Sequence, residues 1–390
     1  MHRISILLGM VGCAADPVSE LAARRSAPPA HYGVVEVPAG LGGANSRANS
    51  IAGPAIAGFS SLAGNTTRHA AVWRDGLLAD LGTLGGPNSN VAWPGQSPRG
   101  ALVAGIAETA DDQPNGEDWS CSAFFPSTTH KVCRGFAWTG GALAAMPTLG
   151  GDNSFATGAN ERGQVVGWAE TAVRDPSCTA PQVLGFLAVV WEPARGRVRT
   201  LAPLPGESAT AATAINRRGQ VVGISGACDV AVGRFSAAHA VLWDEAGAPH
   251  DLGSLGGKSW NTPMAINERG DAAGFSNLPG DDDGTFAPHA TLWTRERGAV
   301  DLGLLPGDDF SEALGLDDAR TVVGLSCKGS ACRAVIWHDG PPAIVLQTLV
   351  GPGIPDTLTG AAAIDEAGRI TGRAKLATGA TLPFIATPVD

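Results

Sequence analysis

The sequence predicts an all-β protein, and three observations carry this prediction. The first is composition, because 53 glycines and 27 prolines stand beside 44% hydrophobic residues in a chain of 390. Such a mixture is typical of many tight turns between short buried strands. The second observation is a set of short apolar runs that end in tryptophan, and the third is a recurring glycine turn followed by a hairpin. A disordered chain would be less apolar and more charged than this one, in which 16% of residues are charged.

The tryptophan-capped runs recur six times. They are HAAVW (69–73), RGFAW (134–138), LAVVW (187–191), HAVLW (239–243), HATLW (289–293) and RAVIW (333–337). Successive tryptophans fall 65, 53, 52, 50 and 44 residues apart, so constant blocks alternate with connections of variable length. A period of this size is typical of repeat folds.

A glycine turn of the type L-x-G or L-G-G separates the units. It occurs at 40–43, 83–86, 148–151, 203–206, 254–257, 304–307 and 348–351. Its glycines permit a sharp crossing from one unit to the next. We expect the asparagines that follow three of these turns to hydrogen-bond the backbone of the turn; they are Asn45, Asn88 and Asn153.

Each unit contains four runs of strand length. In one unit, AIN (265–267) and DAAGFS (271–276) flank the turn ERG, and HATLW (289–293) and AVDLGLL (299–305) flank RERG. Runs this short are typical of strands rather than helices. Four antiparallel strands repeated around an axis predict a β-propeller. We expect the A-I-N strand to be innermost and the D-L-G strand outermost, with the opposite order as the alternative.

The two ends of the chain share the last unit. HYGVVEVP (31–38) matches the strand before the glycine turn, and TLPFIATP (381–388) aligns with the tryptophan strand. The final unit lacks a fourth strand of its own, so the N-terminal segment supplies it. We therefore predict a seven-bladed β-propeller of four-stranded antiparallel blades, closed by pairing of the N- and C-terminal strands, in one domain over residues 31–390. Six or eight blades are the alternatives.

The first thirty residues are typical of an export segment. His2 and Arg3 precede an apolar run, and small residues follow it. Met10-Val11-Gly12-Cys13 resembles a bacterial lipobox, which predicts lipidation at Cys13; plain signal-peptide cleavage is the alternative. We expect a signal peptide at 1–13, a flexible tether at 14–30, and export to the outer membrane, periplasm or extracellular space, with membrane contact only through the lipid anchor.

The six remaining cysteines predict disulfide bonds, because an even number in an exported chain favours pairing. All six fall in loops between the second and third strands of their units. Residues that share one loop, or lie in such loops of neighbouring units, predict three pairs: Cys121–Cys133, Cys178–Cys228 and Cys327–Cys332. The pairs should lie on one face, which is then the expected binding surface.

At these motifs the chain resembles the HAF-repeat family of extracellular bacterial repeat proteins. The matching segments are HAAVW, HAVLW, HATLW, the variant GFAW, D-L-G-T-L-G-G, and A-I-N-E-R-G with V-V-G, within about residues 33–388. Arg320 departs from the pattern, because it stands where other units have the turn glycine. The resemblance implies export and a propeller-like fold, and it supplies no catalytic residues.

Histidine and tryptophan side chains supply two groups of candidate site residues. His69, His239 and His289 open equivalent strands, and equivalent positions of different blades lie far apart, so we expect ring nitrogens satisfied by backbone groups rather than a metal site. The repeated tryptophans predict packing between blades. Trp119 and Trp260 fall in loops outside the repeat and could stack on a sugar or peptide; burial under a loop is the alternative.

Two acidic loops carry the oxygen ligands that calcium prefers. Their residues are Asp111, Asn115 and Asp118 in one loop, and Asp281 and Asp283 in the other. Neither loop follows the spacing of a known calcium-binding loop, so we favour a solvated loop in each case, with calcium as the alternative. We expect no cofactor other than calcium.

The functional prediction depends on the net charge of the chain and on the catalytic and nucleic-acid-binding motifs that its sequence lacks. The net charge of −10 and the absence of a basic cluster argue against nucleic acid, and no nucleophile-elbow, zinc, Walker or dinucleotide motif has its required context. We expect a monomeric scaffold that binds a protein or glycan at the cell surface. The alternative is a lyase or hydrolase acting on a polysaccharide or peptide in a central funnel.

Overall fold

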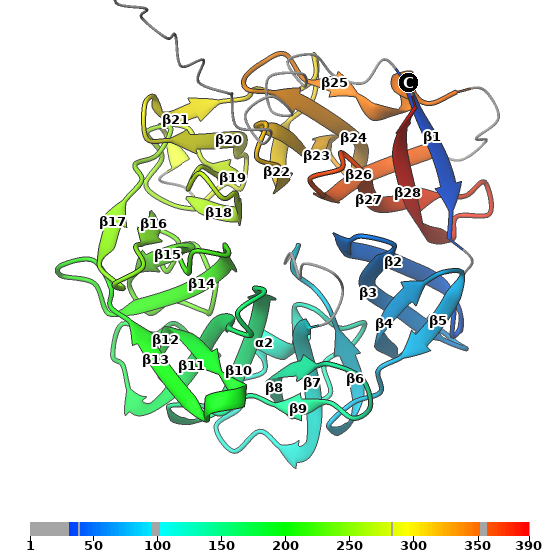
Figure 1. The fold of residues 1–390 in the computed structure, drawn as a ribbon. Helices are drawn as coiled ribbons and strands as arrows, with labels where there is room; N and C mark the ends of the chain where they lie inside the picture. Colours follow the sequence, from blue (N-terminus) through cyan, green and yellow to red (C-terminus); the bar gives the residue numbers. More distant parts are fainter. Residues whose placement is uncertain (1–30, 38–39, 95–101, 282–283, 352–356, 390) are drawn as a thin grey trace, which may run out of the picture.

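The computed structural model describes residues 31–37, 40–94, 102–281, 284–351 and 357–389. These residues form antiparallel sheets arranged around a common centre (Figure 1). Five of the sheets are four-stranded and one is eight-stranded. The all-β prediction is confirmed, with α2 (Trp119–Ser122) and 3-10 turns at Pro193–Arg195 and Leu346–Leu349 as helical additions. None of the described helices is long and apolar enough to cross a membrane.

Each set of four strands runs from an innermost strand beside the common centre to an outermost strand at the rim. The innermost strands are β2 (Gly42–Ala52), β6 (Gly85–Asn90), β10 (Gly150–Ala159), β14 (Ala209–Ile215), β18 (Thr262–Ile266), β22 (Phe310–Leu316) and β26 (Thr357–Ile364). The second strands are β3 (Ala55–Leu62), β7 (Val103–Asp112), β11 (Val165–Arg174), β15 (Val221–Gly226), β19 (Ala272–Ser276), β23 (Thr321–Lys328) and β27 (Ile370–Lys375). The third strands are β4 (Arg68–Arg74), β8 (Lys131–Trp138), β12 (Leu184–Glu192), β16 (His239–Trp243), β20 (His289–Thr294), β24 (Ala331–His338) and β28 (Thr381–Val389). The outermost strands are β5 (Leu77–Asp80), β9 (Ala144–Ala145), β13 (Arg197–Leu201), β17 (Pro249–Asp251), β21 (Gly298–Asp301), β25 (Ile344–Val345) and β1 (His31–Glu36).

The eight-stranded sheet contains both ends of the chain. One half is β26-β27-β28-β1 and the other is β2-β3-β4-β5, and a parallel residue pair between Asn45 and Thr381 connects them. β1 pairs antiparallel with β28 over six residues, as the sequence predicted. Tyr32, the single tyrosine of the chain, is buried in one cluster with Leu358 and Phe384. The N-terminal strand is thereby fixed to a unit that otherwise comes from the C-terminal segment.

The repeated tryptophans pack between neighbouring units, which confirms their predicted role. Trp191, Trp243 and Trp293 are at most 1% exposed. Their Nε1 atoms donate to carbonyl oxygens of the preceding unit: Trp191 to Pro147 at 3.0 Å, Trp243 to Ala202 at 2.8 Å and Trp293 to Gly253 at 2.9 Å. These three rings therefore contribute apolar area to the seam and have their polar atoms satisfied there, whereas Nε1 of Trp73 and of Trp337 is buried without a partner in the described structure.

The glycine of the V-V-G motif is required by a close approach of two backbones. At Gly167 and Gly223, an added Cβ would lie 1.9 Å from the Phe155 carbonyl oxygen and 2.0 Å from the Ala211 carbonyl oxygen. The innermost strand has a β-bulge at this level, between Ala156 and Gly158 in one unit, and the bulge brings its carbonyl against the second strand. The motif therefore marks a bulge opposite a glycine, which the sequence did not reveal.

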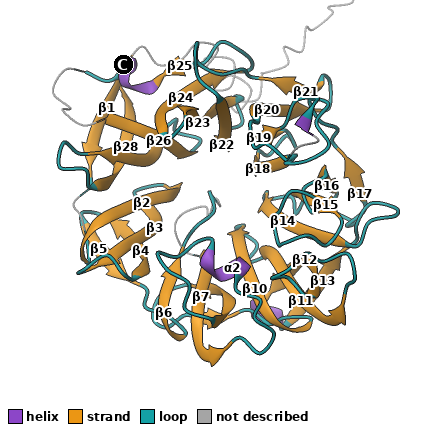
Figure 2. Ribbon diagram, turned by 180° about the vertical axis from the view of Figure 1, so that it is seen from behind, coloured by secondary structure: helices purple, strands orange, loops and turns teal. Residues whose placement is uncertain are grey.

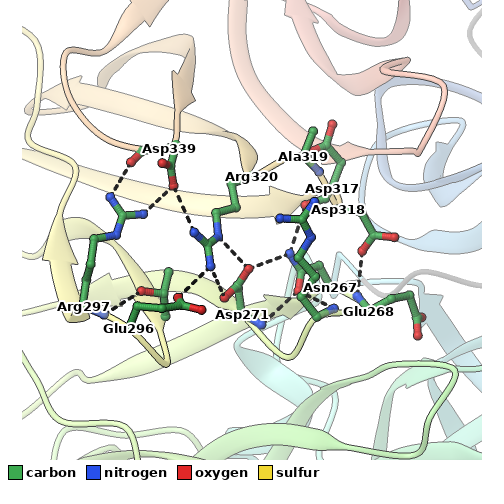
Figure 3. A network of polar contacts seen from close by, with 12 residues as sticks. Asn267, Glu268, Asp271, Glu296, Arg297, Asp317, Asp318, Ala319, Arg320 and Asp339 are labelled. Carbon is green, nitrogen blue, oxygen red and sulfur yellow. Dashed lines mark hydrogen bonds and ion pairs between the residues drawn. The ribbon is translucent and has the colours of Figure 1, made fainter. Parts of the chain in front are cut away.

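The N-x-R-G turns join neighbouring units as well as their own two strands. In each of three turns, the asparagine Nδ2 donates to the backbone carbonyl of the matching residue in the next unit: Asn160 to Asn216 at 3.0 Å, Asn216 to Asn267 at 3.1 Å and Asn267 to Asp317 at 3.2 Å. The same side chains accept from their own turn, as Asn267 does from Arg269 N at 3.0 Å. Figure 3 shows this turn region for the units that contain Asn267 and Asp317.

Candidate functional site

The three predicted disulfides are present. Cys121 is joined to Cys133, Cys178 to Cys228 and Cys327 to Cys332. Each bond lies in or beside a connection between a second and a third strand. Because the units share one strand order and direction, these connections emerge on the same face, which we call the disulfide face. α2 belongs to one of them, between β7 and β8, and lies beside the common centre (Figure 2).

A cavity of about 220 Å³ lies at the centre on this side of the molecule. Its walls come from innermost strands of several sheets, including Arg47 of β2, Thr262 of β18 and Glu312 of β22. Phe124 and Val232, from two connections on the disulfide face, also line it. The cavity therefore lies where the axis meets the predicted binding face.

A structurally equivalent position of the innermost strands supplies charged and polar side chains to this cavity, namely those of Arg47, Thr262 and Glu312. Register places each of its residues opposite the second strand of its own unit at the same level, as Arg47 lies opposite Phe59 and Glu312 opposite Leu325. We call this set the axial ring; its members are Arg47, Asn90, Phe155, Ala211, Thr262, Glu312 and Gly360. These seven equivalent positions thus carry seven different residue types, whereas the turns and seams around them repeat similar residues from unit to unit.

Four buried polar atoms of the cavity have no hydrogen-bond partner within the described structure. They are Arg47 Nε, Asn49 Oδ1, Trp93 Nε1 and Thr262 Oγ1, and all four residues line the cavity. Buried polar atoms in folded proteins are almost always paired. Asn49 is fixed by its other amide atom, since Nδ2 donates to Val91 O at 2.7 Å. The walls of the cavity therefore contain buried donors and an acceptor whose hydrogen-bonding capacity is unused within the described structure.

The described cavity lining carries one cation, Arg47, and one carboxylate, Glu312, and two further arginines lie nearby. Burial, followed by the charge of Arg373, lowers the pKa of Arg47 to about 10, so its guanidinium stays protonated at neutral pH. Arg373 comes from β27 and lies over the axial-ring glycine, because a Cβ at Gly360 would be 3.8 Å from Arg373 Nε. Burial raises the pKa of Glu312, against the opposing effect of Arg47 and Arg373. Arg68 is near enough to lower the pKa of Arg47 and rests 4.2 Å from the Phe59 ring.

An aromatic cluster supports one wall of the cavity. The Trp93 ring lies 5.8 Å from Phe124 and 5.9 Å from Phe155, and Phe155 stacks on Trp168 at 4.3 Å. Cys121 and Cys133 belong to the same buried cluster. The first disulfide therefore holds the connection that carries Phe124 against the cavity.

The aromatic loop residues predicted from the sequence lie in different situations. Trp260 is partly buried, at a φ of +57°, and its ring meets Phe286 edge to face at 5.3 Å. Phe286 is 40% exposed and also meets Phe275, a cavity residue, at 5.7 Å. Trp260 thus belongs to an aromatic surface that continues into the cavity. The side chain of Trp119 lies outside the described part of the structure.

The histidine prediction was right about a structural role and wrong about the partner. His69 pairs with Asp80 at 2.9 Å, His239 with Asp251 at 3.2 Å and His289 with Asp301 at 2.9 Å. Each aspartate belongs to the D-L-G segment of the outermost strand and also accepts from a glycine N–H two residues later. The partners are therefore side-chain carboxylates rather than backbone groups. The aspartate in D-L-G was a visible signal for this pairing.

The residues proposed for calcium mostly bind protein groups. Asp281 accepts from Ser259 N at 3.0 Å and from Lys258 N at 3.1 Å, and it is 8% exposed. Asp118 pairs with His130 at 2.7 Å, and Asn115 donates to Asp152 at 3.0 Å. Asp111 is exposed. Asp283 and Cys13 lie outside the described residues.

Metal-ligand geometry occurs in one group of side chains among the described residues. The group is Asp175, Cys178 and Cys228. Both of its sulfur atoms are joined in a disulfide, so they are not thiolate ligands. The described residues therefore give the calcium prediction no support.

Two buried glutamates, which the sequence did not reveal, attach one connection to the next sheet. Glu117 accepts from Val183 N at 2.7 Å, and Gln182 Nε2 lies 3.4 Å from Glu117 Oε1 and 3.2 Å from Glu170 Oε1. Glu170 also accepts from Asn153 N at 2.7 Å. Burial, with the nearby charge of Glu117, raises the pKa of Glu170 to about 7. The connection that carries α2 is therefore docked against the next sheet through Glu117 and, by way of Gln182, through Glu170.

Comparison with known proteins agrees on the fold. No family model and no curated protein matches the sequence, so the resemblance to the HAF-repeat family remains a prediction. The β-propeller domain of the Trilobed protease from Pyrococcus furiosus, described with an open velcro topology, aligns with a TM-score of 0.51 and 9% identity, covering 92% of this chain and 98% of that one. The Pyrococcus horikoshii acylaminoacyl peptidase aligns with a TM-score of 0.48 and 10% identity over 92% of this chain and 52% of its own, so this chain spans about half of the peptidase. At such identities the likeness shows a β-propeller fold.

Proposed function

We propose that this chain is an exported, monomeric, seven-bladed β-propeller that binds a protein or glycan at the cell surface through its axial cavity. Five four-stranded sheets and the two halves of the eight-stranded sheet supply the seven blades. Pairing of β1 with β28 would close the ring and remove an exposed edge. The disulfides are compatible with an oxidising compartment.

One observation carries the proposed binding role. Four residues that each have a buried polar atom without a partner line one cavity, beside a rim of aromatic side chains on the disulfide face. Ligand sites are commonly concave, mainly apolar and equipped with a few directed polar groups. Exposed Phe286 and half-buried Trp260 would extend the contact surface outward from the cavity.

The composition of the cavity favours binding over catalysis. Of its described lining residues, Glu312 is the one carboxylate, and the lining contains no histidine, cysteine or serine. Glycoside hydrolysis typically uses a pair of carboxylic acids, and nucleophilic hydrolysis a nucleophile paired with a base. The charged groups near Glu312 are instead the guanidiniums of Arg47 and Arg373.

A Thr262→Val exchange tests the binding role. The Thr262 hydroxyl has no partner, so valine should leave the free energy of unfolding within about 0.5 kcal/mol of the wild type. Binding of the disulfide-intact full chain to an array of envelope glycans and peptides should weaken. The matched control is Thr213→Val, because that hydroxyl donates to Val222 O at 3.0 Å and Pro263 O at 2.6 Å and its loss should lower stability instead. Array binding that Thr262→Val leaves unchanged would place the ligand elsewhere.

Export and anchoring are tested separately at Cys13. We expect the wild-type chain to be recovered from the envelope with a lipid-modified N-terminal cysteine, seen by intact mass. Cys13→Ser should abolish the lipid mass while the three internal disulfides form normally. An envelope protein that retains residues 1–12 ahead of Cys13 would contradict the predicted processing.

A further inference from the structure

We infer that the axial cavity takes the carboxylate of a small apolar acid, gripped by Arg47 with Arg373 behind it. This inference rests on the proposed binding role and names the ligand class of that site. The recognised chemistry is a single carboxylate attached to an aromatic or aliphatic group, of the kind an apolar peptide presents at its C-terminus.

The first support is an excess of positive charge without direct partners. Within the described structure, the guanidiniums of Arg47 and Arg373 form no ion pair or side-chain hydrogen bond, and Arg47 Nε is buried. Glu312 is the carboxylate that influences both. Arg47 and Glu312 line the cavity, and the positive charges of Arg373 and Arg68 beside it leave the region net positive. Desolvated charge of this kind is strongly stabilised by a counter-charge.

The second support is the geometry of the hydrogen-bonding groups. A guanidinium offers a rigid fork that matches the two oxygens of a carboxylate. Trp93 Nε1 and Thr262 Oγ1 are further unpartnered donors in the same cavity. An ionised carboxylate accepts about four hydrogen bonds, so it has acceptor capacity beyond the Arg47 fork.

The third support is the apolar remainder of the lining. Phe124, Phe275, Met264 and Leu314 share the cavity with Arg47. They would bury the apolar group of the acid once its carboxylate is bound. Glu312 would repel a second negative charge, so the site favours a monocarboxylate over a dicarboxylate.

Isothermal titration of the disulfide-intact full chain with phenylacetate tests the inference, with phenylacetamide as the uncharged isostere. We expect phenylacetate to bind, and phenylacetamide to bind at least about tenfold more weakly because it lacks the charge-assisted contact. Arg47→Met should reduce phenylacetate affinity by a similar factor, and Arg47→Lys should keep part of it. Arg297→Met is the matched control, because Arg297 pairs with Asp339 outside the cavity and its loss should not affect titration.

Three results would overturn the inference. Equal binding of acid and amide would mean that the cavity selects apolar groups alone. Undiminished binding by a folded Arg47→Met chain would place the acid elsewhere, and the acid–amide comparison on the wild type decides the matter if that variant does not fold. Absence of phenylacetate binding would also reject the carboxylate, whereas array binding that Thr262→Val weakens would still support the proposed function.

Discussion

Arg320 donates two hydrogen bonds to Asp271 across the seam between two units, from Nε to Oδ2 at 2.8 Å and from Nη2 to Oδ1 at 3.0 Å (Figure 3). The Asp271 side chain is 4% exposed and that of Arg320 is 18% exposed. Hydrogen bonding to Asp271 raises the pKa of Arg320. Arg320 holds the turn position that is glycine in other units, at a φ of +62°. The departure from the repeat is therefore explained by a buried ion pair.

Restoring the repeat at this turn should destabilise the protein. Arg320→Gly leaves a buried carboxylate at Asp271 without its counter-charge, which typically costs about 3 kcal/mol or more. Release of the positive-φ strain returns about 1 kcal/mol. We therefore expect a net loss of roughly 2 kcal/mol in the free energy of unfolding, measured by urea denaturation.

The neighbouring repeats supply a control for this variant. At two other seams a turn glycine faces a glutamine that holds the Asp271 position of the preceding unit: an added Cβ would lie 3.2 Å from Gln220 Oε1 at Gly270 and 3.6 Å from Gln164 Oε1 at Gly219. The double variant Arg320→Gly with Asp271→Gln should thus recover most of the lost stability. A double variant as unstable as Arg320→Gly would show that the ion pair is not the cause.

Tyr32 should be decisive for the pairing of the two ends of the chain. Its side chain is 1% exposed, and Tyr32→Ala removes an aromatic ring from the cluster that fixes β1, at a cost of about 3 kcal/mol. Amide hydrogens of β28 should exchange faster in this variant, as seen by mass spectrometry. Val35→Ala is the control, because Val35 is 68% exposed on the same strand. Equal exchange in both variants would argue against a structural role for Tyr32 in this closure.

Removal of individual disulfides should destabilise the protein in the order of loop length. Cys178–Cys228 spans 50 residues and Cys327–Cys332 spans 5, so chain entropy predicts losses of about 4 and about 2 kcal/mol for the paired alanine variants. Cys327 and Cys332 are also held opposite each other by the β23–β24 hairpin. Denaturation under non-reducing conditions measures the difference. A larger loss at Cys327–Cys332 would contradict the entropic account.

Glu170 should make stability depend on pH. Its folded pKa is raised from 4.5 to about 7, so below pH 4.5 both states are protonated and the group has no effect. Between these two values the unfolded state loses the proton first, and the free energy of unfolding should fall by about 3 kcal/mol before levelling off above the folded pKa.

Glu170→Gln isolates this contribution. The variant should match the wild type near pH 4.5 and be more stable than it at about pH 8, because a buried amide carries no charge to desolvate. Urea titrations at several pH values measure the difference, with Glu245→Gln on the exposed surface as the control. Parallel pH profiles for wild type and Glu170→Gln would show that the Glu170 carboxyl titrates normally.

Much of the architecture could be predicted because its signals are local and repeated. The hairpin turns, the glycine crossings and the pairing of 31–36 with the last strand were all visible in the sequence, as were the three disulfides. Asn88 and Asn153 were expected to serve their own turns, but their side chains accept from Arg68 N and Cys133 N of the preceding unit. A contact between units leaves no local pattern, so only the assembled sheets place it.

The sequence by itself determined the strands, their order and the face that carries the disulfides, since each follows from short-range periodicity and from cysteine position. The tertiary structure alone decided that Arg47, Thr262 and Glu312 meet, although they are separated by up to 265 residues. They meet because each occupies the same level of an innermost strand, and the sheets turn that level toward a common axis. The repeated residues build the seams, and three residues of the position that varies line the cavity.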